Sequence, residues 1–314
     1  MKAVVIRRYG SPEVLQYEDV EQPKIKPEQL LVKVHASSVN PIDWKIRKGM
    51  LSLLTGNKFP MILGFDLAGE VIAVGSQVTR FQPGDSIYGS TGFPGGAYAE
   101  FAAVSENLVA PKPTNLTYEE AAVVPLAALT ALQALRDQGN IQAGQAVLVN
   151  GAAGGVGIFA VQIAKALGTQ VTGVCSTKNL DFVKSLGADH LIDYTRQDFT
   201  EGIAQYDIVF DVVGKRSLST SKRVLKPNGI YITTLPTPEI FVQGILTAFI
   251  PGQKAKFIIE RPNTQDLVYL KDLIEAGKIQ VVIDRTYPLA ELAAAHTCSE
   301  TERAVGKIAI AVAS

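Results

Sequence analysis

The sequence predicts an α/β protein that combines a β-rich, mostly antiparallel domain with a doubly wound parallel sheet. Three observations lead to this fold class. Short β-branched runs separated by proline and glycine fill residues 1 to about 113, strands and helices alternate from residue 146 onward, and a glycine-rich turn joins the first strand of that alternation to a helix. The 314 residues are enough for about two such domains.

The N-terminal part carries the strand and turn signals of a compact β-domain. Runs rich in valine, isoleucine and leucine predict strands over Lys2–Ile6, Leu30–His35 and Gly69–Gly75. Gln82–Asp85 contains the Pro-Gly pair of a tight turn. The composition then shifts to alanine and leucine with few breakers, so Glu119–Arg136 is expected to form a helical connector.

The alternation that follows predicts repeated βαβ units, which form a parallel, doubly wound sheet. The expected strands are Ala146–Asn150, Gln170–Cys175, Ala188–Ile192, Ile208–Val212 and Ile230–Thr234, and the helices after the first two end at Leu167 and Leu186. A last stretch, from Val281–Ile283 to Lys307–Ile310, is expected to return to the first domain. The expected domains are therefore 1–122, 123–268 and 269–314.

Net charge and cysteine content exclude several classes of partner. Lys and Arg together number 30, as do Asp and Glu, so the zero net charge supplies no field for a nucleic acid or a polybasic membrane anchor. The two cysteines, Cys175 and Cys298, are too few for a disulfide framework or a multi-cysteine zinc loop and suit a reducing compartment. No targeting segment is evident after Met1, so we expect a cytoplasmic protein with a small neutral partner.

The most apolar stretch, Ile240–Ile250, is too short for a membrane span, which takes about 18 continuous apolar residues. It is compatible with a helix. We expect it to line a substrate pocket or to form a dimer interface, with contact to a membrane surface as the less favoured alternative. We expect the chain to form a homodimer.

The glycine-rich turn predicts a dinucleotide site. Glycine permits a tight turn and the close approach of a pyrophosphate, whose charge is attracted by the N–H groups and the dipole at the helix N-terminus. A strand precedes this turn and a βαβ unit surrounds it, which favours cofactor binding over a simple packing turn. The residues assigned to the cofactor are Gly151, Ala153, Gly154, Gly155, Val156 and Gly157.

The end of the second strand of this sheet selects between NAD and NADP, because an acidic residue there would bind the ribose 2′-hydroxyl and repel a 2′-phosphate. No acidic residue stands there. Ser176, Thr177 and Lys178 offer two hydroxyls and a cation instead, and Tyr194 adds a phenolic donor after the next strand, so we predict NADPH. The alternative is that Lys178 opens a solvated helix face and Tyr194 packs over an edge.

With these motifs in place, the sequence resembles the zinc-independent quinone oxidoreductase branch of the medium-chain dehydrogenase/reductase superfamily over essentially its whole length. The matching motifs are Ala36–Asp43, Gly64–Gly69, Pro83–Asp85, Ala153–Gly157 and Ala304–Ile308. Two longer stretches, Asn40–Met50 and Phe182–Asp189, are similar to plant chloroplast envelope quinone oxidoreductase homologues and alkenal/enone reductases.

The resemblance implies a GroES-like catalytic domain, built from both ends of the chain, with a Rossmann domain inserted and the active site in the cleft between them. Zinc-dependent relatives have a catalytic Cys about where this chain has Asn40, and a Gly-His-Glu where it has Gly64, Phe65 and Asp66. A catalytic zinc needs about three ligands, so we expect no metal.

The same resemblance implies site residues. Asn40 and Asp43 should border the nicotinamide and the substrate, Thr130 should lie beside the nicotinamide ring, and Gly306 with Lys307 should close the cleft on the cofactor. Each polar residue also has a structural alternative: an Asx turn for Asn40, a helix N-cap for Asp43 and a cap or back-bond within its helix for Thr130.

The function implied is reduction of a quinone, or of the C=C bond of an α,β-unsaturated ketone, by hydride transfer from NADPH without zinc. Such a reduction needs hydrogen bonds that stabilise the developing enolate, and water can supply the proton. Two alternatives stay open. One is one-electron reduction of a quinone, and the other is a non-catalytic NADPH-binding sensor or scaffold.

Overall fold

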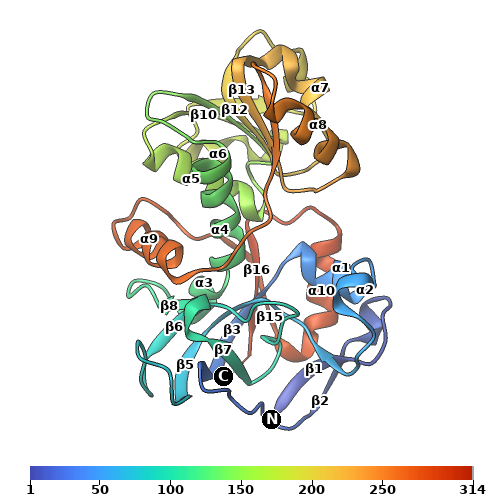
Figure 1. Ribbon diagram of the computed structural model, residues 1–314, viewed down its shortest axis with the longest axis vertical. Coiled ribbons are helices and arrows are strands. Elements are labelled where there is room, and N and C mark those ends of the chain that lie inside the picture. Colours follow the sequence, from blue (N-terminus) through green and yellow to red (C-terminus); the bar gives the residue numbers. More distant parts are fainter. Residues whose placement is uncertain (313–314) are drawn as a thin grey trace. The chain divides into compact units, whose positions relative to one another are not determined.

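The computed structural model describes residues 1–312, and the chain divides into two compact units (Figure 1). Unit 1 contains Met1–Ala127, Pro262–Glu275 and the residues from Val281 onward, and unit 2 contains Ala128–Arg261 and Ala276–Gln280. The sequence-based boundaries, 122/123 and 268/269, differ from these by a few residues. On the C-terminal side the difference arises because helix α9 (Thr264–Glu275) packs in unit 1, where the Tyr88 hydroxyl donates to the carbonyl of Leu267 at 2.6 Å.

Unit 1 is built from two sheets. Its strands are β1 (Lys2–Ile6), β2 (Gln16–Asp19), β3 (Gln29–Val39), β4 (Met61–Ile62), β5 (Asp66–Val74), β6 (Ser86–Ser90), β7 (Phe101–Ser105), β8 (Val109–Pro111), β15 (Ile283–Pro288) and β16 (Lys307–Ala311). The orders are β2-β1-β4 and β15-β16-β3-β5-β6-β8, with β7 also paired to β3. All these pairs are antiparallel except β15 with β16, which confirms a mostly antiparallel first domain. The last strand, β16, pairs with β3, so the final residues do return to this sheet.

The helical connector expected over 119–136 is present, but it is interrupted rather than continuous. The structure has α3 (Tyr118–Ala122), a break, and then α4 (Pro125–Gln133), followed by a π-helical turn over Ala134–Gln138. Proline has no N–H and its ring clashes with the carbonyl four residues earlier, so Pro125 begins a helix but does not continue one. The remaining helices of unit 1 are α1 (Pro41–Arg47), α2 (Ser52–Thr55) and α10 (Leu292–Glu300).

Strand β3 contributes apolar residues to the core of unit 1 in its first half and buried polar residues in its second half. Leu30, Val32 and Val34 alternate along its first half and are fully buried. In the second half every side chain from Ala36 to Val39 is buried, so both faces of the sheet are covered there, while β16 and β5 pair with its two edges. Ser37 and Ser38 are therefore carried into the interior, where polar groups need hydrogen-bond partners.

Unit 2 contains one parallel sheet. Its strands are β9 (Ala146–Asn150), β10 (Gln170–Cys175), β11 (His190–Asp193), β12 (Tyr206–Asp211), β13 (Leu225–Thr233) and β14 (Lys254–Phe257). They lie in the order β11-β10-β9-β12-β13-β14, and all pairs are parallel. In chain order this is third, second, first, fourth, fifth, sixth, which is the dinucleotide-binding order of a doubly wound sheet. The predicted fold class is confirmed.

The core of unit 2 forms on strands whose residues are buried over most of their length, as a covered parallel sheet requires. Leu148, Val174, Val209 and Tyr231 belong to one buried cluster. The helices are α5 (Gly155–Ala166), α6 (Leu180–Ser185), α7 (Leu218–Ser221) and α8 (Pro238–Ala248). Helix α5 begins directly at the glycine-rich turn, because the extended Gly154 is its N-cap.

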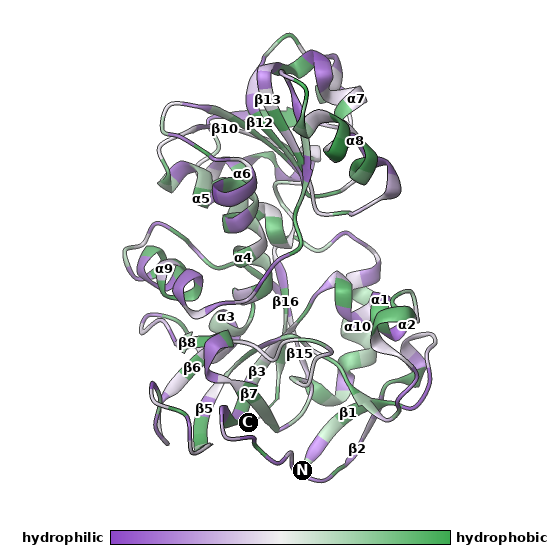
Figure 2. Ribbon diagram, viewed as in Figure 1, coloured by the Kyte–Doolittle hydropathy of each residue, from purple (hydrophilic) through white to green (hydrophobic). Residues whose placement is uncertain are grey.

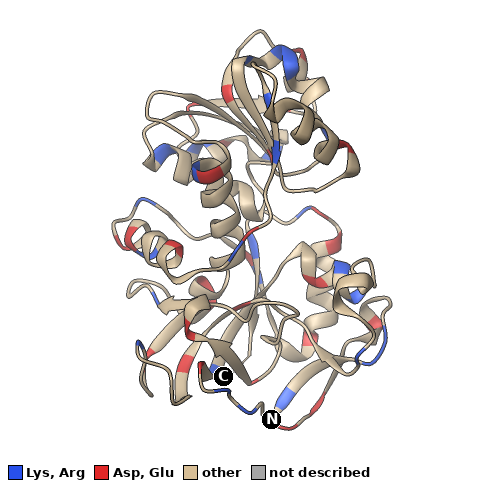
Figure 3. Cartoon of the chain, viewed as in Figure 1, with Lys and Arg blue, Asp and Glu red and all other residues tan. Residues whose placement is uncertain are grey.

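Helix α8 contains most of the apolar stretch noted in the sequence and exposes much of it. Figure 2 shows α8 as one of the most hydrophobic segments of unit 2. Ile245 is 64% exposed and Leu246 58%, and Phe249 just beyond the helix is 87% exposed. Among residues 1–312, no helix combines the length and the apolar composition that crossing a bilayer requires. Figure 3 shows acidic and basic residues on both units.

Candidate functional site

The junction between β9 and α5 fits the pyrophosphate of a dinucleotide. Gly151 takes a left-handed φ of +88°. A Cβ at Gly157 would lie 2.0 Å from the carbonyl oxygen of Gly151, so only glycine allows this contact between helix and turn. A Cβ at Gly154 would meet nothing nearer than that oxygen at 3.5 Å, so packing within the protein does not require glycine there. Open space at Gly154 is what a bound phosphate group needs.

The residues around this glycine complete an anion site. Ala153 precedes the N-cap, and Gly155 and Val156 form the first turn of α5, whose N–H groups have no partner within the helix. The dipole of this 12-residue helix adds positive potential at the same end. The junction also lies where β9 and β12 are neighbours and the strand order reverses, which is the ligand-binding edge of such sheets.

The loop after β10 presents the predicted residues for the ribose end of the cofactor. Lys178 and Thr177 are exposed and Ser176 is half-buried, while Tyr194 after β11 is 62% exposed. As predicted, no acidic residue directly follows β10. The structure nevertheless brings a carboxylate to this loop, because Asp193 ends the neighbouring strand opposite Cys175.

Asp193 is a residue of this region that the sequence analysis missed. The Thr177 hydroxyl donates to its carboxylate, and Thr195 donates both its hydroxyl, at 2.7 Å, and its N–H, at 2.9 Å. The hydrogen bond from Thr177 holds the pKa of Asp193 below its usual value. The Arg196 guanidinium lies 3.5 Å away and compensates the charge. Thr177 is thus engaged by Asp193, which leaves Lys178 as the predicted cation for a 2′-phosphate.

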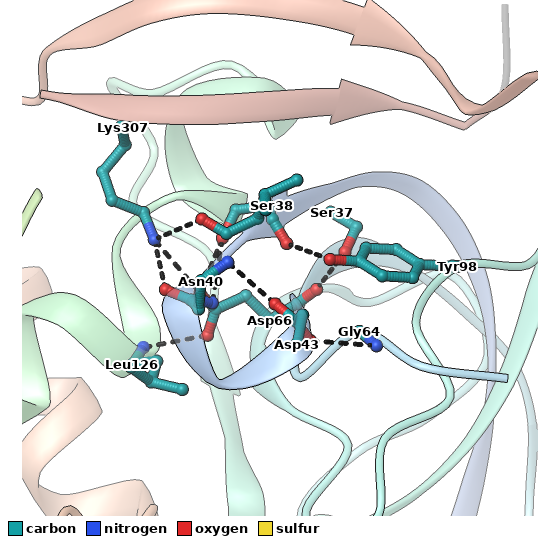
Figure 4. A network of polar contacts seen from close by, with 10 residues as sticks. Ser37, Ser38, Asn40, Asp43, Gly64, Asp66, Tyr98, Leu126 and Lys307 are labelled. Carbon is teal, nitrogen blue, oxygen red and sulfur yellow. Dashed lines mark hydrogen bonds and ion pairs between the residues drawn. The ribbon is translucent and has the colours of Figure 1, made fainter. Parts of the chain in front are cut away.

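In unit 1 the predicted residues Asn40, Asp43 and Lys307 belong to one buried polar network (Figure 4). They lie on the loop between β3 and α1, on α1 and at the start of β16. Two further members, Asp66 at the start of β5 and Ser38 on β3, connect them. We call this set the Asn40 network.

Only one of the two flip states of the Asn40 carboxamide can form hydrogen bonds with all of its neighbours. Its Oδ1 accepts from the Lys307 ammonium, and its Nδ2 donates to Asp66 Oδ2 at 2.8 Å and to Ser38 Oγ at 3.3 Å. An ammonium only donates and a carboxylate only accepts, so a flipped amide would face repulsion on both sides. Asn40 is 1% exposed and is the N-cap residue of α1, so its side chain also lies where a structural role at the start of the helix is possible.

The Asp43 side chain stabilises the N-terminus of α1 by hydrogen bonds. Its carboxylate accepts from the N–H of Asn40 at 2.7 Å and from the N–H of Gly64 at 3.2 Å. This is the reciprocal half of a capping box, so a structural role for Asp43 is present in the fold. Complete burial raises the pKa of Asp43 to about 7, against the lowering effect of the Asn40 N–H. Burial likewise raises the pKa of the neighbouring Tyr98 phenol, whose hydroxyl donates to Ser38 O at 3.2 Å.

Lys307 and Asp66 are the charged pair of the Asn40 network. Both are buried, at 4% and 0% side-chain exposure, and Nζ lies 3.8 Å from Asp66 Oδ2. Burial lowers the pKa of Lys307, and Asp66 and Asp43 oppose that effect. Asp66 also accepts from the N–H of Leu126 at 2.9 Å and from Ser38 Oγ at 2.7 Å, so both its oxygens are engaged.

Two further predicted site residues are Thr130 and Gly306. Thr130 lies on the part of α4 that belongs to unit 2 and is 7% exposed. Gly306 has a φ of +87°, and a Cβ there would lie 2.6 Å from the carbonyl oxygen of Val282, so the turn into β16 needs glycine. Their contacts with a cofactor stay predictions.

The two positions that align with metal ligands of zinc-dependent relatives have other contacts in this structure. Asn40 is held by Lys307 and Asp66, and Phe65 is a member of the apolar core of unit 1. Within residues 1–312, no cluster of three or more His, Cys, Asp or Glu side chains is arranged to hold a metal ion. Zinc independence itself stays a prediction.

Comparison with known proteins places this chain in a family. Residues 26–114 match the alcohol dehydrogenase GroES-like domain, and residues 186–310 match a family described as zinc-binding dehydrogenase. A chloroplastic quinone-oxidoreductase homologue of Spinacia oleracea is 36% identical, covering 99% of this chain and 98% of the relative. A chloroplastic NADPH-dependent alkenal/one oxidoreductase of Arabidopsis thaliana is 35% identical, covering 99% and 79%.

A solved structure supports the same assignment over the full length. The quinone oxidoreductase from Coxiella burnetii has a TM-score of 0.92 to this chain at 35% identity, with 100% of this chain and 99% of that one covered. The glycine-rich junction of unit 2 agrees with a nicotinamide dinucleotide as cofactor. The chain therefore belongs to the quinone oxidoreductase branch of the medium-chain dehydrogenase/reductase superfamily.

Proposed function

We propose that this chain is an NADPH-dependent reductase that transfers hydride to a quinone or to the β-carbon of an α,β-unsaturated ketone. The observation that carries the proposal is the combination of a dinucleotide junction in unit 2 with a buried network in unit 1 that holds the Asn40 carboxamide, a hydrogen-bond donor, in one orientation. Relatives named as a quinone-oxidoreductase homologue and as an NADPH-dependent alkenal/one oxidoreductase support the acceptor class.

The choice of NADPH depends on the loop after β10. Lys178 is exposed there, and Ser176 supplies a hydroxyl at the same turn. The Asp193 carboxylate does not oppose a phosphate strongly, because Thr177, Thr195 and Arg196 surround it. A cation on this loop interacts more strongly with a charged 2′-phosphate than with a neutral 2′-hydroxyl.

The reduced nicotinamide, when bound, supplies the hydride. The contribution of this chain is to stabilise negative charge that develops on the substrate oxygen, for which a held hydrogen-bond donor is effective. Asn40 is the candidate donor, because its 3.3 Å contact to Ser38 Oγ is its weakest and is the one that a substrate oxygen can replace. Water can supply the final proton to carbon.

The test follows oxidation of NADPH and of NADH against a panel of quinones, short enals and bulky enones. Deuterium at the transferable 4-position of NADPH should appear at the β-carbon of the reduced ketone. Asn40→Ala should lower enone turnover by about 100-fold, since loss of one such donor costs about 3 kcal/mol. Asn107→Ala is the matched control, because its amide oxygen bonds only the Arg80 guanidinium on the surface of unit 1.

Two results would contradict the proposed hydride-transfer activity. Detection of one-electron quinone products without deuterium at carbon would replace hydride transfer by the one-electron alternative. A wild-type protein that binds NADPH and reduces no acceptor of either class would leave the non-catalytic alternative.

A further inference from the structure

The Asn40 network contains one buried lysine, Lys307, at the start of β16. Lys307 Nζ contacts Asn40 Oδ1, the carbonyl oxygen of Val39 at 3.5 Å and Asp66 Oδ2 at 3.8 Å. A buried lysine is rare unless it is paired, and pairing to a carboxylate alone would satisfy its charge. Its shortest contact is nevertheless to the neutral carboxamide of Asn40 rather than to the carboxylate.

Lys307 and Asp66 together fix the orientation of the Asn40 side chain. Lys307 bonds the oxygen of the Asn40 carboxamide and Asp66 bonds its nitrogen, so the amide dipole is aligned between a cation and an anion. A cation at the carbonyl oxygen also withdraws electron density from the amide and strengthens the N–H groups as donors. The remaining N–H is directed to Ser38 Oγ over the long distance of 3.3 Å.

We propose that Lys307 is a positioning residue, which holds the Asn40 carboxamide in the orientation from which the N–H now bonded to Ser38 Oγ can pass to the substrate oxygen. This inference rests on the proposed function, in which Asn40 is the donor. The family resemblance implies that Lys307 contacts the cofactor, in which case its loss would weaken NADPH binding. Here Lys307 acts on Asn40, so its loss should slow turnover instead. Lys307→Met should therefore lower kcat and leave NADPH affinity almost unchanged.

A double-mutant cycle separates positioning from general stability. Lys307→Met should lower kcat about 10- to 100-fold, since misplacing a catalytic donor by about 1 Å can cost that much. In an Asn40→Ala background the same substitution should change kcat less than about 3-fold, because a residue that acts through Asn40 has nothing left to act on. The NADPH dissociation constant, measured by fluorescence, should change less than about 3-fold in both backgrounds.

Two control variants test whether the effect of Lys307→Met comes from misfolding or from an unbalanced buried charge. Lys307→Met leaves Asp66 buried without its cation, so the charge-balanced variant Asp66→Asn with Lys307→Met is measured in parallel. Lys112→Met is the matched control for loss of a partly buried lysine in unit 1, because its ammonium bonds the carbonyls of Pro113 and Leu116. Lys112→Met should keep wild-type kcat.

A readout without turnover keeps the inference separate from the proposed function. The side-chain amide signals of Asn40 in ¹⁵N-labelled protein, identified by their loss in Asn40→Ala, should form one sharp pair in the wild type. They should broaden or double in the Lys307 variants. An unchanged pair would overturn the inference even if the wild type reduced no acceptor, as would equal kcat losses with and without Asn40, or a loss confined to NADPH affinity.

Discussion

His296 on α10 gives a pH-dependent prediction that rests on packing rather than on the site. Its ring is 0% exposed, neither nitrogen has a hydrogen-bond partner, and it lies edge-on to Tyr98 with ring centroids 5.7 Å apart. Burial, with a smaller contribution from the Arg47 guanidinium, lowers the pKa of His296 from its ordinary 6.5 to about 3.

The sign follows from where the proton binds. Between pH 6.5 and about 3 the unfolded chain binds a proton at His296 and the folded chain does not, so the free energy of unfolding falls as the pH falls. Each pKa unit corresponds to about 1.4 kcal/mol, so acidification from about pH 6.5 to about pH 4.5 should remove about 2 kcal/mol through this residue alone.

The measurement compares urea unfolding of the wild type with His296→Leu at several pH values. Contributions from carboxyl groups are common to both proteins and cancel in the comparison. The variant should lose about 2 kcal/mol less over this range, and at neutral pH it should be no less stable, because it removes two buried unpartnered nitrogens. Parallel curves for the two proteins would show that His296 is protonated in the folded state or reaches solvent, and would refute the argument.

Four other outcomes are expected. Lys178→Ala should weaken NADPH binding by about 10- to 100-fold and leave NADH binding unchanged, since a hydrogen bond to a charged group contributes about 1.5–3 kcal/mol; equal losses for both cofactors would contradict the phosphate assignment. Gly154→Val should weaken cofactor binding at least about tenfold with little change in Tm, whereas Gly157→Ala should cost about 2–3 kcal/mol of stability, because its Cβ overlaps a backbone oxygen. Exhaustive treatment with a zinc chelator should leave turnover intact, and stoichiometric zinc in active protein would oppose this. Leu246→Lys on the exposed face of α8 should convert the expected homodimer to monomer in sedimentation, and an unchanged mass would remove α8 as the interface.

Sequence patterns predicted the fold well where each strand is buried on both faces or bounded by a clear breaker. The strands Lys2–Ile6, Ala146–Asn150 and Gln170–Cys175 have the predicted bounds. The connector over 119–136 is helical as expected, but composition did not reveal the break before Pro125, where a proline begins a new helix.

The candidate site was only partly predictable. Asn40, Asp43 and Lys307 were named from the resemblance, but residues 40 and 307 come together only through the pairing of β3 with β16, which periodicity does not reveal. Asp66 was noted only as a lost metal position, although it binds both Asn40 and Leu126. Asp193 was missed because its approach to Thr177 depends on the register of neighbouring parallel strands.

The pairing of β16 with β3 also has a consequence for biosynthesis. Asn40 and Lys307 are 267 positions apart, and the whole of unit 2 is translated between them. A nascent chain that has already exposed Asp66 and Asn40 has no ammonium to place between them until β16 leaves the ribosome. The sheet of unit 2 contains only strands from 146 to 257, so it can form earlier. Cofactor-binding capacity should thus precede a complete Asn40 network during synthesis, and unit 1 is the part of the protein that a chaperone would have to protect longest.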